Sequence, residues 1–427
     1  MRNSRAHTSV QSVPVLRIAD PPRPKSRQWR VIHACEYARD VLPILEGQIT
    51  AGMRPFIVTP MGAGTAEAYL ARKDLEQPDA LSLLRAWQDV RNWRKSLLEC
   101  DPENKADLVH THSFSSGMAG VRNLSCVVYD FKACIEELAM SAGQCERGSW
   151  MARSFRVAEQ FILSRAKAVI VHSQGMKSAA HERGAAPENV FLIPAPVALD
   201  ELPLMPTNFL REHFAIDNSS TIFYLPQSLP AQGSSAALGC ALEAFALAVA
   251  ANPELRLLIE AAPEQFPGIR GHAERLGISK HIVCVEEKEA SAVLQGVDVV
   301  ISTGETPDDP VHARYPNPAC LQALSAGKPL LAADVEHNRG ASPEGRGCLW
   351  FRENDAHDLA SRVTFLAGNP GFRAALANAG RALIVETRSS TVIGHEYDAA
   401  YRHALAQKRA NGPGPGATTL LPITSTT

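Results

Sequence analysis

Residues Cys320–Ala332 read CLQALSAGKPLLA, and this stretch decides the fold class of the chain. It combines a helical segment that ends at Gly327 with an apolar strand that begins after Pro329. Glycine often ends a helix, and a short apolar strand next to a helix is typical of a parallel sheet with covering helices. The stretch therefore predicts an α/β protein.

Two blocks of the same alternation lie on either side of a proline-rich joint at Pro194–Pro206. In each block short apolar runs alternate with helical patterns, as in doubly wound parallel sheets. We expect two Rossmann-like domains facing a central cleft, with ligands at the carboxyl ends of the strands. The expected boundaries are a disordered N-terminal segment at 1–27, a first domain at 28–205, a second domain at 206–389, a C-terminal helix at 390–410 that packs back on the first domain, and a disordered tail at 411–427.

The composition excludes several classes of protein. The 427 residues include 43 Lys and Arg against 45 Asp and Glu, so the chain lacks the basic excess of a general nucleic-acid binder. Nine cysteines are dispersed without a Cys-x-x-Cys pair, which is typical of reduced thiols in a cytoplasmic protein. No signal-peptide pattern is present, and no run approaches the roughly 20 apolar residues of a membrane-spanning helix. We expect a cytoplasmic protein that binds no nucleic acid.

Several segments resemble, in the same order, the retaining glycosyltransferases of family four (glycosyl transferases group 1). The first stretch resembles the family's LEAMASGKPVVA, DLVHTHS at Asp107–Ser113 resembles D-V-V-H-x-H-S, and NVFLIPAPVALDEL at Asn189–Leu202 resembles N-V-x-V-I-P-N-G-V-D. The resemblance covers about residues 28–405 and implies a GT-B fold. It also implies transfer of a sugar from a nucleotide-sugar donor to a glycan or lipid-linked acceptor in cell-surface polysaccharide or glycoconjugate biosynthesis. The resemblance implies no cofactor and no metal.

The resemblance places the donor site in the second domain, where this chain departs from the family pattern. The family's Arg and Lys that grip the donor phosphates match Gln227 and Gln232, and its two glutamates match Arg314 and Gln322. The family's glycine-rich turn is Tyr315-Pro-Asn-Pro318 here, in which Asn317 can cap the helix. The expected donor-binding residues are Gln227, Gln232, Gly233, Arg314, Asn317 and Gln322.

Other charged residues could compensate for the lost donor contacts. A charge-assisted hydrogen bond is worth roughly 1.5–3 kcal/mol, so the loss of two would weaken donor binding by a few powers of ten. Arg314, Lys328 or Arg339 could reach the phosphates, and Glu305, Asp308 or Asp309 could replace a carboxylate. The alternative is a catalytically inactive pseudo-glycosyltransferase that acts as a binding or scaffold subunit, with an active glycosyltransferase as partner. A cation and a carboxylate that converge beside the Cys320 helix would favour the enzyme.

The acceptor side is expected in the first domain, near Glu36 and three candidate catalytic residues. His110 and His112 flank a strand end, and Asp130 follows the next strand, where relatives often carry a catalytic His or Asp. The H-x-H pair could hold a metal, but no carboxylate or Cys cluster accompanies it in the sequence. We therefore expect one pocket-lining and one packed histidine and no metal. The alternative for Asp130 is a turn or cap residue.

A basic segment with two tryptophans, Arg85–Lys95, has two interpretations. It could lie on the inner membrane surface near a lipid-linked acceptor, which would make the protein peripheral to the cytoplasmic membrane. It could instead be an ordinary amphipathic helix, with Leu84, Trp87 and Leu98 in the core and its charges in water. We expect core packing.

Overall fold

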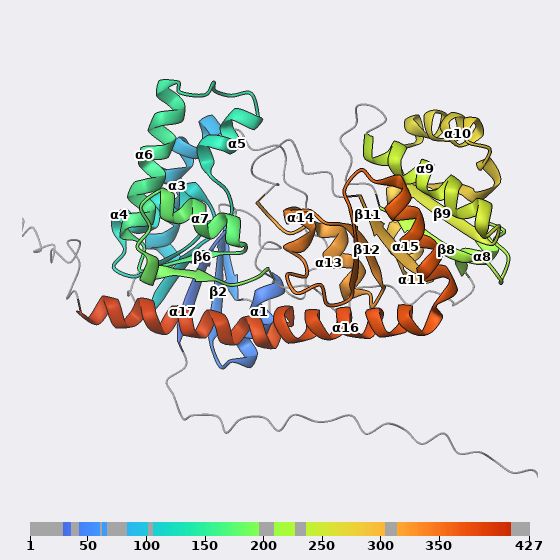
Figure 1. Cartoon of the computed structure of the whole chain (residues 1–427). Coiled ribbons are helices and arrows are strands. Elements are labelled where there is room, and N and C mark those ends of the chain that lie inside the picture. The colour runs from blue at the N-terminus through green and yellow to red at the C-terminus, as the bar shows by residue number, and fades with distance from the viewer. Residues whose placement is uncertain are drawn as a thin grey trace, which may run out of the picture.

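The computed structural model describes residues 29–35, 42–59, 62–65, 83–100, 106–195, 209–226, 236–303 and 314–410. Figure 1 shows two α/β units side by side, with a pair of long helices beneath both. Strands alternate with helices along the chain, as the sequence predicts.

The first sheet is parallel except at one edge. Its strand order is β3-β2-β1-β4-β5-β6-β7, and β3 pairs antiparallel with β2. The sequence did not predict β3, because Gly62–Thr65 lacks the apolar pattern of a strand. The chain reverses direction across the sheet between β1 and β4, which is where doubly wound sheets bind ligands. The strands are β1 (Arg30–Ala34), β2 (Arg54–Thr59), β3 (Gly62–Thr65), β4 (Leu108–Thr111), β5 (Val127–Asp130), β6 (Ala168–Val171) and β7 (Val190–Leu192).

The second sheet is parallel throughout, in the order β10-β9-β8-β11-β12-β13. Its switch point lies between β8 and β11. The described strands are four to six residues long and mostly buried, so they read as continuous apolar runs. They are β8 (Thr221–Leu225), β9 (Leu255–Glu260), β10 (Ile282–Val285), β11 (Val299–Ser302), β12 (Leu330–Ala333) and β13 (Cys348–Phe351).

Helices cover both sheets. In the first unit, Ser113 caps the helix that follows it. Its side chain accepts a hydrogen bond from the Ser116 N–H, and the Ser116 hydroxyl accepts one from the Ser113 N–H. The helices here are α1 (Leu42–Thr50), α3 (Leu83–Cys100), α4 (Phe114–Asn123), α5 (Ile135–Ser141), α6 (Trp150–Arg165) and α7 (Gln174–Glu182). Those of the second unit are α8 (Phe209–His213), α9 (Ala236–Ala251), α10 (Phe266–Arg275), α11 (Ala290–Gly296), α13 (Pro318–Ser325), α14 (Glu336–Arg339) and α15 (Ala356–Gly368).

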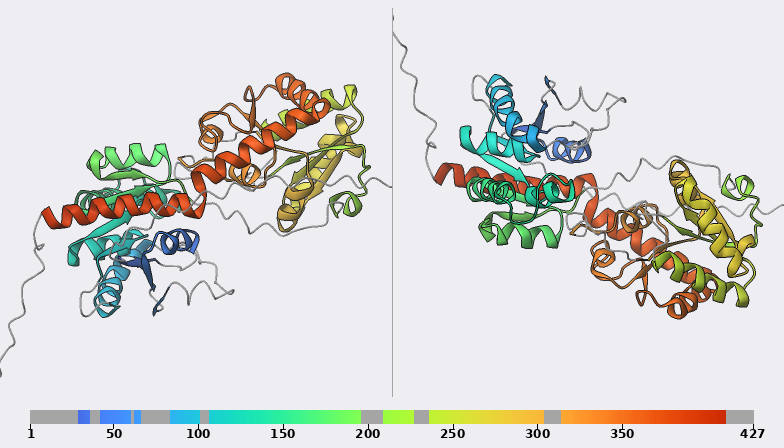
Figure 2. Two further views of the ribbon diagram at one scale, coloured as in Figure 1. Left: turned by 90° about the horizontal axis from the view of Figure 1, so that it is seen from below. Right: turned by 90° about the horizontal axis from the view of Figure 1, so that it is seen from above.

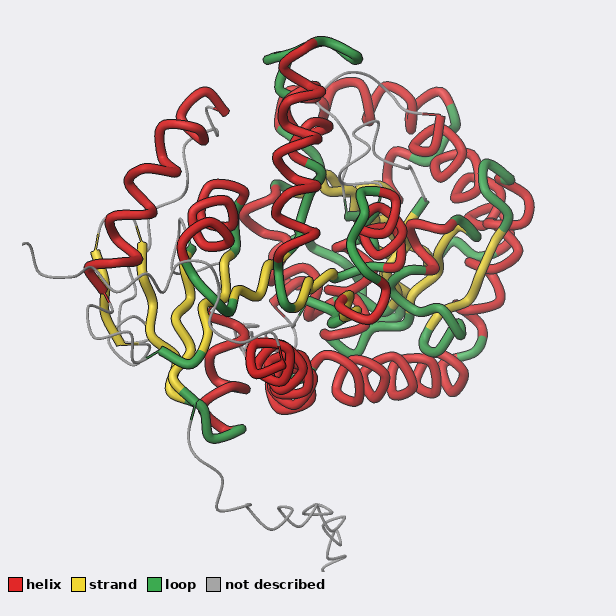
Figure 3. The backbone as a smooth tube through the Cα atoms, turned by 90° about the vertical axis from the view of Figure 1, so that its left-hand side faces the viewer, coloured by secondary structure: helices red, strands yellow, loops and turns green. Residues whose placement is uncertain are grey.

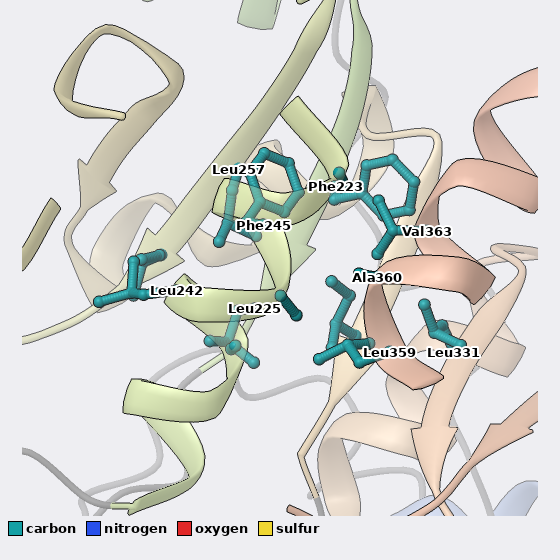
Figure 4. Packing of buried hydrophobic residues seen from close by; sticks show 14 of the residues in the cluster. Phe223, Leu225, Leu242, Phe245, Leu257, Leu331, Leu359, Ala360 and Val363 are labelled. Carbon is teal, nitrogen blue, oxygen red and sulfur yellow. The ribbon is translucent and has the colours of Figure 1, made fainter. Parts of the chain in front are cut away.

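The core of the second unit shows how its helices are held on the sheet. Figure 4 shows Phe223 and Leu257 of the sheet with Phe245 of α9 and Val363 of α15. All four side chains are buried in one continuous cluster. Burial of such side chains contributes roughly 1.5–3 kcal/mol each, so this packing fixes the strands whose carboxyl ends face the first unit.

Two long helices, α16 (Pro370–Arg388) and α17 (Ser390–Ala410), join the units from below (Figure 2). α16 packs on α13 of the second unit, while α17 crosses α1 and the first sheet. In Figure 1 the two helices follow each other along the lower edge, and Figure 3 shows α17 nearly end-on with α16 running sideways from it. The crossing is close at two glycines, since a Cβ on Gly394 would lie 2.3 Å from the Gly47 carbonyl oxygen.

The α3 helix packs its tryptophan face into the first unit. Trp93 and Leu97 are buried, whereas Leu98 is 48% exposed, so the expectation that Leu98 faces the core is wrong. The helix is rotated so that Leu97, and not Leu98, falls on the apolar face with Trp93. The side chains of Leu84 and Trp87 lie outside the described residues. Within the described part of the chain, no helix is both long and apolar enough to cross a bilayer.

Candidate functional site

Three buried histidines meet at the switch point of the first sheet. His33 near the end of β1 pairs in register with His110 of β4, and His112 follows two residues later. Parallel strands present their carboxyl ends at one edge of the sheet, so these side chains are brought together by the backbone alone. The His33 Nδ1 and His112 Nε2 atoms are 2.9 Å apart. The sequence predicted His110 and His112 for this site but missed His33, whose one signal was its place near a strand end.

The outer nitrogen of each histidine bonds to a different oxygen. His33 Nε2 lies 2.8 Å from Gln48 Oε1, His112 Nδ1 lies 2.9 Å from Asp130 Oδ2, and His110 Nδ1 lies 2.9 Å from the Tyr401 hydroxyl. Gln48 Nε2 also donates to the Tyr401 hydroxyl. Tyr401 belongs to α17, so the C-terminal helix completes a site whose other members come from the first unit.

Asp130 is the anion of this cluster and does not act as a helix cap. Its carboxylate lies 2.9 Å from His112 Nδ1, 2.8 Å from His172 Nε2 and 3.6 Å from the Lys132 ammonium. Burial alone would raise the pKa of this carboxyl, but His172, Lys132 and the His112 hydrogen bond hold the pKa well below its ordinary value. Asp130 is therefore ionised at neutral pH.

His33 and His110 are neutral at pH 7. Burial, followed by the neighbouring His112, lowers the pKa of His33 to about 3. Burial and the other two histidines also lower the pKa of His110 well below its ordinary value. His110 Nε2 is buried and has no hydrogen-bond partner among the residues that the structure describes. His33 and His110 thus present neutral imidazole nitrogens at a buried position.

In the second unit, three hydrogen-bonded polar side chains hold the amino end of α13 in place. The Asn317 Oδ1 atom accepts the Ala319 N–H, so Asn317 caps the helix that begins at Pro318. Its Nδ2 donates to Ser302 Oγ at the end of β11 and to Asn338 Oδ1. The sequence predicted the cap, but it did not identify Ser302 and Asn338. Asn317 is 5% exposed, so its side chain positions the helix end.

The structure separates the other predicted donor residues. Gln322 lies on α13 with an exposed side chain. Lys328 donates to the carbonyl oxygens of Gln295 and Val297 beside the amino end of β12, and burial lowers its pKa. Arg339 pairs with Asp334 and lies over the Trp350 ring, with 5.0 Å from the guanidinium carbon to the ring centre. Both cations are thus already engaged by oxygen atoms of neighbouring residues.

Arg314 joins the two units. Its Nη1 and Nη2 atoms lie 2.6 and 3.0 Å from the two carboxylate oxygens of Glu137, on α5 of the first unit. The next residue, Tyr315, donates its hydroxyl to the Lys132 carbonyl oxygen. These contacts join segments that follow the carboxyl ends of β5 and β11, so the carboxyl edges of the two sheets face each other. A cation and a carboxylate do converge near α13, but they come from different units and pair with each other.

Glu137 belongs to an acidic group that the sequence did not identify. Arg183 lies 2.9 Å from Glu136, 3.3 Å from Glu137 and 3.1 Å from Glu159. Burial raises the pKa of Glu159 to about 8. The contacts are formed by side chains 24 to 47 positions from Arg183, which sequence spacing does not predict. The remaining predicted residues lie outside the described part of the chain: Glu36, Gln227, Gln232, Gly233, Glu305, Asp308 and Asp309.

Residues 3–196 match the family model of the Glycosyl transferase 4-like domain, and no curated protein matches the chain. Similar solved structures include a glycosyltransferase from Rickettsia africae, at 15% identity and a TM-score of 0.64 over 89% of this chain and 99% of that one. HepE of Anabaena in complex with UDP has 14% identity and a TM-score of 0.61, over 88% and 100% of the chains. HepE also occurs in complexes with UDP and glucose and with UDP-glucose. Sucrose-phosphate synthase of Thermosynechococcus elongatus has 14% identity and a TM-score of 0.56, over 89% and 100%.

These similarities confirm the predicted GT-B fold, which consists of two Rossmann-like domains. The chain is glycosyltransferase-like in architecture, and its structural neighbours include proteins that bind UDP and UDP-glucose.

Proposed function

We propose that this chain transfers a sugar from a nucleotide-sugar to a glycan or lipid-linked acceptor, with retention at the anomeric carbon, in cell-surface polysaccharide or glycoconjugate biosynthesis. The observation that carries the proposal is the contact between the segments after β5 and β11. It brings the capped end of α13 and the polar cluster of the first domain to the same side. Helix amino ends favour anions, so a donor diphosphate fits beside α13.

The donor residues divide into two roles under this proposal. Asn317 holds the helix end in place, while Gln322 can hydrogen-bond a neutral hydroxyl of the sugar or ribose. Arg314 lies four residues before the amino end of α13, and it must leave Glu137 to reach a phosphate. UDP-sugars are the first donors to test, because HepE of similar fold has been solved with UDP-glucose.

The acceptor residues act by positioning. His110 and Asp130 are nearly inaccessible, and His112 is only 7% exposed, so these three side chains shape the acceptor edge from within. Lys132 is the cluster member with a partly exposed side chain, at 36%. Its ammonium can bind an anionic acceptor, such as a lipid-linked phosphate, on the inner membrane surface.

The alternative is a catalytically inactive scaffold subunit that binds an active glycosyltransferase. Two observations favour it. The guanidinium of Arg314 is already held by Glu137 at both nitrogens, and Gln322 supplies an amide where the family has a carboxylate. A site of this kind would have a low affinity for a diphosphate.

A thermal-shift series with UDP, GDP, ADP and their sugar conjugates tests the proposal. A ligand at about a hundred times its dissociation constant stabilises the folded chain by roughly 2.7 kcal/mol, which raises the melting temperature by a few degrees. We expect a shift with one nucleotide only, and sugar release to water or acceptor with the matching conjugate. No shift with any nucleotide would support the scaffold.

A gain-of-function variant distinguishes a donor site that only lacks the family's binding residues from a donor site that a nucleotide cannot enter. Gln227→Arg, Gln232→Lys and Gln322→Glu together restore the residues of the family pattern. We expect tighter nucleotide binding in this triple variant than in the parent chain. Unchanged binding, with an unchanged melting temperature, would count against a donor site beside α13.

A further inference from the structure

We propose that His33, His110 and His112 form a binding site for a divalent transition-metal ion, with Zn²⁺ the best match. The site is independent of the nucleotide-sugar proposal, because none of its three ligands belongs to the donor side. Imidazole is a ligand that Zn²⁺ shares with Co²⁺, Ni²⁺ and Cu²⁺, and three buried imidazoles whose ring nitrogens converge suit these ions.

The three side chains already converge. One ring nitrogen from each lies within 4.8 Å of one from each of the others, and His33 Nδ1 is 2.9 Å from His112 Nε2. Two nitrogens bound to one zinc ion at about 2.0–2.1 Å lie roughly 2.9–3.4 Å apart for angles near 90–110°. The His33–His112 distance thus falls within the range of a shared ion, and His110 completes the set with a small movement.

Each histidine also has the outer partner that a metal ligand requires. Ligating histidines usually bond through their second nitrogen to a carboxylate, a carbonyl or another oxygen, which fixes the ring orientation. Gln48 Oε1 serves His33, Asp130 Oδ2 serves His112, and the Tyr401 hydroxyl serves His110. The second nitrogen of each ring would then bind the metal ion: His33 Nδ1, His112 Nε2 and His110 Nε2.

A cation fits between the two rings when His112 is neutral. If His33 Nε2–H donates to Gln48 Oε1 and a neutral His112 donates its one proton from Nδ1 to Asp130, the atoms that face each other at 2.9 Å are two lone pairs, whereas a protonated His112 would donate its Nε2–H to His33 Nδ1. A metal ion between them removes this repulsion. It also engages His110 Nε2, which is buried and has no hydrogen-bond partner among the described residues.

The competing arrangement contains no metal. If the Gln48 amide is turned so that its nitrogen donates to His33 Nε2, the His33 Nδ1–H can donate to His112 Nε2, and the row of hydrogen bonds closes. This arrangement still leaves His110 Nε2 without a partner among the described residues. The two arrangements predict different responses to added metal.

Cobalt is the probe that tests the site. The full chain, stripped with a chelator, should take up one equivalent of Co²⁺ and develop the visible absorption bands of nitrogen-coordinated cobalt, and one equivalent of Zn²⁺ should abolish them. Metal analysis of the protein purified without chelator should find close to one zinc per chain. Absence of the bands in the folded parent chain would overturn the proposal, whatever the variants do.

Variants identify the ligands. His110→Asn should weaken Co²⁺ binding by more than about tenfold. His281→Asn is the control, because His281 is also buried but lies in the second unit, where its Nδ1 faces the Leu255 carbonyl oxygen. Circular dichroism confirms that each variant is folded. Equal cobalt affinity in the two variants would also overturn the proposal.

Discussion

At the scale of single residues, the first domain contains a row of polar side chains that satisfy one another in the interior. Tyr401 is central to it, because its hydroxyl contacts both Gln48 and His110. Removing one partner of a buried hydrogen bond costs more than the bond contributes, since the other partner stays buried without a replacement. The stability of this row of hydrogen bonds therefore depends on each of its members.

Tyr401→Phe should lower the free energy of unfolding by about 1–3 kcal/mol, because it leaves Gln48 Nε2 and His110 Nδ1 without their partner. Tyr397→Phe is the matched control. Tyr397 is equally buried on the same helix, and its hydroxyl has no hydrogen-bond partner among the described residues. Urea unfolding of the three proteins measures the difference. Equal losses in the two variants would contradict this account.

Glu159 makes stability depend on pH. Its pKa is about 8 in the folded chain, against 4.5 when unfolded, so the folded state binds the extra proton between these values. Stability from this group is therefore present below about pH 4.5 and is lost as pH rises toward 8. Glu159→Gln has no ionisable group at this position, so it does not lose stability in this way. The free energy of unfolding of the variant, relative to that of the parent chain, should therefore increase from pH 5 to pH 8, by at most about 1.4 kcal/mol per pH unit. Thermal melting across this range tests the sign; a constant difference would refute it.

At the scale of helices and strands, the crossing of α1 and α17 links the C-terminus to the site. Gly47 and Gly394 allow the two helices to approach so closely that a Cβ on Gly47 would lie 1.8 Å from the Ser390 carbonyl oxygen. This approach places Tyr401 of α17 against Gln48 of α1. The geometry of the polar row is thus set by a helix crossing whose closest approach lies at two glycines.

Gly394→Ala should separate α17 from α1 and destabilise the chain by about 1–3 kcal/mol, the usual cost of overpacking. It should also speed proteolysis near the C-terminal helix. Gly371→Ala on α16 is the control, because a Cβ there meets no atom within 4 Å, and it should be neutral or slightly stabilising. Comparable melting temperatures for the two variants would show that the crossing tolerates a methyl group.

At the scale of the whole molecule, the domains are held by contacts between their carboxyl edges and by the helices beneath them. Arg314 and Glu137 form the ion pair between the edges, and Arg388 of α16 donates to the Ala195 carbonyl oxygen. Under the proposed function, a donor diphosphate would use the Arg314 guanidinium that Glu137 already holds. Nucleotide binding and domain contact would then compete for one side chain.

Glu137→Gln should raise nucleotide affinity several-fold, up to about tenfold, because a neutral amide holds Arg314 less strongly than a carboxylate. Glu136→Gln is the matched control: Glu136 pairs with Arg156 and Arg183 and, among the pairs observed, not with Arg314. Isothermal titration with the nucleotide that shifts the melting temperature measures the effect. If both variants bind like the parent chain, Arg314 does not contact the donor.

The sequence by itself determined the α/β class with its two blocks and the cap at Asn317, because apolar periodicity and capping residues act over a few neighbouring positions. The GT-B architecture was expected from the resemblance of several segments to a known family, and the structure confirms it. It also pointed to His110, His112 and Asp130. Only the tertiary structure brought His33, Gln48 and Tyr401 to them, and only it joined Arg314 to Glu137. Those contacts span up to 353 positions and depend on sheet register and helix crossing, which local patterns do not encode.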